Sequence, residues 1–100
     1  MMARKRKYSE EQFGATIERL MAEKRLTYRG LAAKTDLSAG YLNHLVHGNR
    51  PVPSMDVVAR LAAALGVEPE YFREYRLRVI ADRLEQMPDL VDRLYKKLAV

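Results

Sequence analysis

Two histidines, His44 and His47, have the side chains best suited to metal chemistry, because they stand three residues apart and would share one face of a helix. A metal site needs further ligands, but the chain has no cysteine and no third ligand near this pair. The sequence also lacks a glycine-rich phosphate loop, a serine in a nucleophile elbow, and carboxylates clustered with a base. We therefore expect no enzyme activity, no metal and no cofactor.

Both histidines belong to the segment Thr27–Gly48, which predicts two short helices joined by a tight turn. Thr27 and Ser38 are each placed to cap a helix, because their hydroxyls can accept hydrogen bonds from unpaired backbone N–H groups. Apolar residues at helical spacing can meet in one small core, namely Leu31, Ala32, Leu37, Leu42 and Leu45. The other side chains of the second helix are left for solvent or for a partner.

Helices are also predicted on both sides of this segment. Before it, Ser9–Gln12 fits a capping box, and Tyr8 with Phe13 fits a hydrophobic staple. The helix that follows has an apolar stripe of Phe13, Ile17, Leu20 and Met21 and is expected to run to Lys24 or Arg25. After Gly48, a loop with two prolines leads to Ser54, which is placed to cap a helix that ends at Gly66.

Several spacings agree at once with a known family: Leu31-Ala32, Leu37-Ser38, Leu42, Leu45 and Gly48, then Pro53-Ser54 and the run Val58–Val67. On these residues the chain resembles the Cro and phage-repressor type of helix-turn-helix regulator, the xenobiotic-response-element family, from about Phe13 to Phe72. The resemblance implies an all-α, five-helix lambda-repressor-like DNA-binding domain with a C-terminal helical extension. Three residues depart from the family pattern: Asp36 replaces a turn glycine, Val46 a glutamate, and Tyr28 a glutamine.

Carried over residue by residue, the resemblance implies that the second helix of the motif enters the major groove of double-stranded DNA. The positions that then face base edges are Ala39, Gly40, Asn43 and His44. Asparagine can pair with adenine and imidazole can donate to guanine, whereas alanine and glycine offer little hydrogen bonding. The positions implied near the phosphate backbone are Tyr28, Arg29, Ser38, Asn49 and Arg50.

The net charge of +5 is unevenly distributed. Residues 1–50 carry ten Lys and Arg against five Asp and Glu, whereas residues 51–100 carry eight of each. A basic half favours a polyanionic partner, because binding phosphates releases counterions. Part of the excess lies in a predicted disordered arm, residues 1–8, with the cluster Arg4, Lys5, Arg6 and Lys7. This arm is either a further DNA contact or a solvated tail.

The C-terminal third predicts two amphipathic helices. Pro69 suits the first turn of a short helix, which is expected to continue to Gln86 with Glu74 and Arg78 as an exposed ion pair. Pro88 then begins another helix. The apolar positions predict a homodimer interface comprising Tyr71, Phe72, Tyr75, Val79, Ile80, Leu84, Val91, Leu94, Tyr95 and Leu98. An intramolecular hairpin that extends the core is the alternative.

The expected organisation is an arm at 1–8, a DNA-binding domain at 9–72 and a helical extension at 73–100. We expect a dimeric, sequence-specific DNA-binding transcription regulator, most simply a repressor, that reads DNA with helix 39–47. The alternatives are an architectural DNA-binding protein of low specificity, and an antitoxin-like or adaptor protein whose C-terminal helices bind another polypeptide.

No apolar run approaches the roughly 20 residues that span a membrane. No small-molecule ligand is evident. A cytoplasmic, nucleoid-associated protein of bacterial or phage origin is expected.

Overall fold

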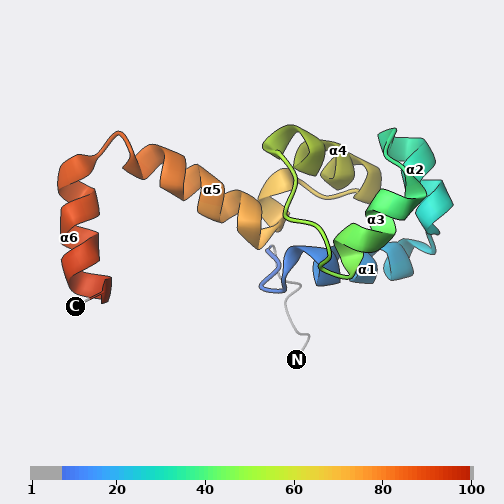
Figure 1. Cartoon of the computed structure of the whole chain (residues 1–100), viewed down its shortest axis with the longest axis horizontal. Coiled ribbons are helices and arrows are strands. Elements are labelled where there is room, and N and C mark those ends of the chain that lie inside the picture. The colour runs from blue at the N-terminus through green and yellow to red at the C-terminus, as the bar shows by residue number, and fades with distance from the viewer. Residues whose placement is uncertain (1–7, 100) are drawn as a thin grey trace, which may run out of the picture.

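The computed structural model describes residues 8–99, and over this range it contains helices and no strand (Figure 1). In chain order the elements are α1 (Phe13–Lys24), α2 (Tyr28–Thr35), α3 (Ala39–Val46), α4 (Met55–Leu65), the short 3₁₀ helix η1 (Pro69–Tyr71), α5 (Arg73–Leu84) and α6 (Pro88–Ala99). The prediction of an all-α fold is confirmed. None of the described helices is long and apolar enough to cross a membrane.

The local signals that bound the central helices act as predicted. The hydroxyl oxygens of Thr27 and Ser38 accept hydrogen bonds from the backbone N–H groups of Gly30 and Tyr41, each at 3.0 Å. Ser54 caps α4 in the same way, at 3.4 Å from the nitrogen of Val57. Asp36 ends α2 in the left-handed conformation with φ of 61°, which aspartate tolerates better than most residues. The turn therefore forms without glycine.

The predicted capping box at the start of α1 is wrong. Gln12 is the N-cap and its side chain makes no capping hydrogen bond. Ser9 is buried instead, and its hydroxyl lies 2.8 Å from that of Thr16. The N–H of Phe13 donates to the Glu74 carboxylate at 3.1 Å. The cap of α1 thus comes from the start of α5, and the predicted pairing of Glu74 with Arg78 does not occur.

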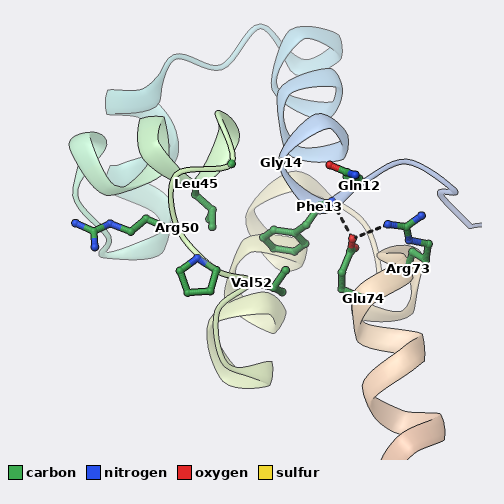
Figure 2. A pocket seen from close by; sticks show the side chains of 10 residues that line it. Gln12, Phe13, Gly14, Leu45, Arg50, Val52, Arg73 and Glu74 are labelled. Carbon is green, nitrogen blue, oxygen red and sulfur yellow. Dashed lines mark hydrogen bonds and ion pairs between the residues drawn. The ribbon is translucent and has the colours of Figure 1, made fainter.

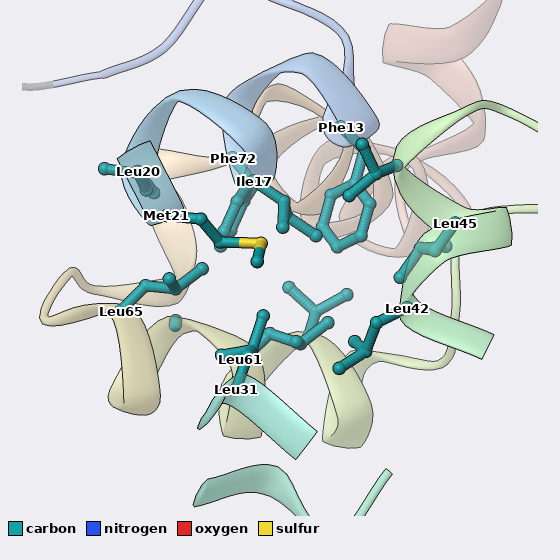
Figure 3. Packing of buried hydrophobic residues seen from close by; sticks show 13 residues of the cluster. Phe13, Ile17, Leu20, Met21, Leu31, Leu42, Leu45, Leu61, Leu65 and Phe72 are labelled. Carbon is teal, nitrogen blue, oxygen red and sulfur yellow. The ribbon is translucent and has the colours of Figure 1, made fainter. Parts of the chain in front are cut away.

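The core lies between α1, α2, α3 and α4 and is closed by Phe72 (Figure 3). Phe72 is 0% exposed, and its ring centroid lies 4.8 Å from that of Phe13. Its placement in a dimer interface is therefore wrong, because it is already buried within its own chain. Tyr71 and Tyr75, predicted for the same interface, are half-buried and pack against this core.

The helix predicted to run unbroken from Pro69 is divided at Phe72, whose backbone is extended with φ of −82° and ψ of 129°. Beyond this break α5 projects away from the domain, and α6 turns sharply from its end (Figure 1). The radius of gyration is 16.0 Å, compared with about 13 Å for an ordinary compact chain of this length. The projecting helices account for the difference.

Candidate nucleic-acid interface

Helices α2 and α3 are held together by buried leucines, which leaves the opposite side of α3 open. Leu31 and Leu42 are fully buried, and Leu45 is nearly so. Val46, which occupies the glutamate position of the family, is also buried, so packing replaces any polar contact there. Tyr41 is half-buried against the core and so belongs partly to the scaffold.

The four predicted base-reading residues come together on one face of α3. They form two pairs four residues apart, and such pairs are neighbours on a helix surface. Gly40, Asn43 and His44 are exposed and Ala39 is half-buried. A Cβ atom on Gly40 would have no neighbour within 4 Å, so this part of the face is open. His47 is tied to the same helix, with its Nδ1 atom 2.8 Å from the carbonyl oxygen of Asn43.

The predicted phosphate-contacting residues lie at the two ends of the motif. Arg29 stands in the first turn of α2, and Asn49 and Arg50 follow α3; all three are exposed. Within the described residues, neither Arg29 nor Arg50 has an acidic partner. Tyr28 is half-buried against the core, and the Ser38 hydroxyl is engaged in its cap. Among these five residues, the two arginines carry a positive charge that is unpaired within residues 8–99, whereas Tyr28 packs against the core and Ser38 caps α3.

Three arginines of the C-terminal half donate hydrogen bonds to backbone carbonyl oxygens of the same chain. Arg60 of α4 donates to the carbonyl oxygen of Thr35 at 2.9 Å and so satisfies the end of α2. Arg76 donates to the carbonyl oxygens of Ser9 and Tyr71, at 2.8 and 3.0 Å. Arg78 donates to the carbonyl oxygens of Val52 and Pro53. These three arginines are therefore engaged in holding the fold together.

Two features beside the end of α3 were missed in the sequence. Gly14 allows α1 to pass directly under the end of α3, because a Cβ atom there would lie 2.5 Å from the carbonyl oxygen of Val46. An open pocket of about 330 Å³ adjoins this contact, with Glu74 and Arg73 on one side and Leu45 and Arg50 among the residues on the other (Figure 2). Such contacts join residues far apart in the chain and leave no local signature.

The predicted arm residues Arg4, Lys5, Arg6 and Lys7 lie outside the described residues. Within residues 8–99, no three His, Asp or Glu side chains are grouped so that they could hold a metal ion.

Comparison with known proteins assigns the family. A family model described as a helix-turn-helix domain matches residues 12–75, which include α2, α3 and the capping contacts around them. The chain belongs to the helix-turn-helix domain family. The prediction of a DNA-binding domain of the transcription-regulator class is thereby confirmed.

Known proteins similar to this helix-turn-helix chain include the transcriptional regulator PrpR of Mycobacterium tuberculosis, 33% identical over 86 residues. That match covers 85% of this chain but only 18% of PrpR. The crystal structure of the clp gene regulator ClgR from Corynebacterium glutamicum matches with a TM-score of 0.56 and 29% identity, covering 85% of this chain and 88% of that one.

The SinR–SinI protein complex also has a chain of the same fold. It matches with a TM-score of 0.54 and covers 89% of this chain and 100% of that one. At 17% identity, this likeness concerns the fold alone.

Proposed function

We propose that this chain is a sequence-specific transcription regulator, most simply a repressor, that binds double-stranded DNA as a homodimer with α3 in the major groove. The observation that carries the proposal is the exposed face of α3 with Asn43 and His44, preceded in the chain by Arg29 and followed by Arg50, which are exposed and have no acidic partner among the described residues. Phosphate contacts would fix the position of the helix, and base contacts would select the sequence. Such a protein acts in the cytoplasm, at the nucleoid.

Hydrogen-bonded readout in this proposal depends on two side chains. Asn43 can bind an adenine through its carbonyl and amino groups together, and His44 can donate to N7 or O6 of a guanine. Ala39 would meet a thymine methyl, and Gly40 would allow close backbone approach. Each bidentate contact discriminates by about 1–3 kcal/mol. The sequence selectivity of one chain would therefore be modest, and a second copy bound to a second half-site would increase it.

The homodimer is supported by the large apolar side chains that α5 and α6 leave exposed. Tyr95 and Leu98 of α6 are 65% and 78% exposed. Other exposed apolar residues lie on the same two helices or in the connection between them, namely Leu77, Ile80, Met87 and Val91. Val79, Leu84 and Leu94 of the predicted interface are half-buried. Exposed apolar patches of this kind mark interaction surfaces. A two-fold axis through α5 and α6 would present two α3 helices to paired half-sites about 34–36 Å apart or at multiples of that distance.

A second candidate function is an adaptor whose C-terminal helices bind a different polypeptide. It is favoured by the same exposed apolar face. Capture of a different protein would use the surface that the homodimer uses, so the two assemblies would compete.

Selection of duplexes from a random pool, followed by titration of the enriched site at several salt concentrations, tests the proposed function. We expect a defined two-fold motif bound at least about 10³-fold more tightly than random DNA. Binding to both within a few-fold would favour an architectural protein of low specificity. An absence of binding at low salt would favour the adaptor.

A further inference from the structure

Helix α5 is bonded to one segment that precedes α3 in the chain and to another that follows it, although α5 is not part of the helix-turn-helix itself. At its root, Phe72 is buried in the core. Two residues later, an oxygen of the Glu74 carboxylate accepts the N–H of Phe13 at 3.1 Å, as Figure 2 shows. Phe13 begins α1, and the next residue, Gly14, lies against the end of α3. This first attachment therefore reaches the recognition helix through α1.

The second attachment is made by Arg78, and it reaches the segment that follows α3. Its guanidinium donates from Nη2 to the carbonyl oxygen of Val52 at 2.9 Å and from Nη1 to that of Pro53. A planar guanidinium that holds two carbonyls at once fixes an orientation, which a single hydrogen bond does not. The held segment has little freedom of its own, because Pro51 and Pro53 restrict its backbone.

Glu74 and Arg78 stand four residues apart and so share one face of α5. They join α5 to the start of α1 and to the segment after α3, and Arg76 adds hydrogen bonds to the carbonyl oxygens of Ser9 and Tyr71. We propose that Arg78 sets the half-site spacing that the dimer accepts, by holding α5 at a fixed angle to the recognition helix. This inference rests on the proposed dimeric DNA binding and assigns Arg78 a positioning role in it.

Because α5 is long, a small change in its angle moves its far end, and with it α6, by several ångströms. Its 12 residues span about 18 Å, at about 1.5 Å per residue. A tilt of about 10° at the root would therefore move the far end by about 3 Å, close to the rise of about 3.4 Å between base pairs. The exposed apolar residues of α6 lie beyond that far end. A small loosening at Arg78 would therefore blur the distance between the two α3 helices on the scale of one base pair.

The test uses the full chain and duplexes that carry two copies of the selected half-site, separated by spacers that differ by single base pairs. For the intact chain we expect one spacing to bind at least about tenfold more tightly than its neighbours. Arg78→Ala should reduce that preference to about threefold or less, while the affinity for an isolated half-site changes by less than about twofold. Arg83→Ala removes the same charge from the same exposed helix and should leave the preference intact.

Circular dichroism establishes that each variant is folded. If Arg78→Ala is not folded, Arg78→Gln replaces it, because its amide can still donate to one of the two carbonyls; its spacing preference should also fall below that of the intact chain. A folded Arg78 variant that keeps the tenfold preference would overturn the inference alone. If the intact chain discriminates between no spacings, the dimeric mode of binding fails, and the inference fails with it.

Discussion

Gly14 and Val46 are in closer contact than any side chain would allow: a Cβ atom on Gly14 would lie 2.5 Å from the carbonyl oxygen of Val46. The neighbouring carbonyl of Leu45 would lie at 2.8 Å. Both obstacles are backbone atoms, which cannot turn aside as a flexible side chain can. The end of α3 can therefore lie directly against α1 only because residue 14 is glycine.

The first prediction concerns the stability of this contact. Gly14→Ala should lower the free energy of unfolding by about 1–3 kcal/mol, because the added methyl group forces α1 and α3 apart. Urea denaturation measures the change. Gly40→Ala is a matched control, because Gly40 is likewise the second residue of its helix and has open space around it. That control should be stabilised by up to about 1 kcal/mol through helix propensity. Equal effects of the two substitutions would show that helix propensity alone is at work.

The second prediction separates the two N-caps of the motif. Ser38→Ala and Thr27→Ala should each cost about 0.5–2 kcal/mol of stability, because each leaves a backbone N–H of α3 or α2 without its hydroxyl partner. Only Ser38 begins the helix proposed to enter the groove. Fluorescence anisotropy with the selected duplex should therefore show a larger loss of affinity for Ser38→Ala. A larger loss for Thr27→Ala would place the DNA at the start of α2 instead.

The third prediction distinguishes base contacts from phosphate contacts. Asn43→Ala should cost about 1–3 kcal/mol on the preferred site and little on random DNA, because it removes a bidentate base contact. Arg50→Ala should weaken binding to all sequences and reduce the slope of log K against log salt by about 1. Titrations of preferred and random duplexes at four salt concentrations give both quantities. An unchanged base preference in Asn43→Ala would remove that residue from the readout.

The fourth prediction addresses the apolar face of α6. Val91→Asp should convert a dimer into a monomer, because it places a charge among the exposed apolar residues of that helix. Light scattering measures the mass, and circular dichroism should show an unchanged fold. Arg93→Gln changes the charge by the same amount at an exposed polar position of α6 and should leave the mass unaltered. A monomeric intact chain would contradict the prediction at once.

The sequence predicts those parts of this fold that have local causes. The caps of α2, α3 and α4 are made by a residue and an N–H three positions later, so their spacing is visible in the sequence. The left-handed turn at Asp36 likewise depends on one residue. The apolar stripes repeat at helical intervals, and most of the residues predicted from them are buried.

The contacts that attach α5 to the rest of the domain could not be predicted in this way. The N–H of Phe13 finds its acceptor 61 residues later, in Glu74. Arg78 donates to carbonyl oxygens 25 and 26 residues earlier, and any residue type would offer a carbonyl there. The i, i+4 spacing of Glu74 and Arg78 indicated a local ion pair, but in the structure each side chain bonds to a backbone group much farther away along the chain.

The attachments of α5 also determine where this chain can be recombined with others. A chimera that exchanges the C-terminal helices at Arg73, where α5 begins, would discard both Glu74 and Arg78 and leave the N–H of Phe13 and two loop carbonyls without their partners. A junction after Arg78 would retain them and transfer only the last turns of α5 together with α6. The exchangeable module therefore begins within α5 and not at its first residue.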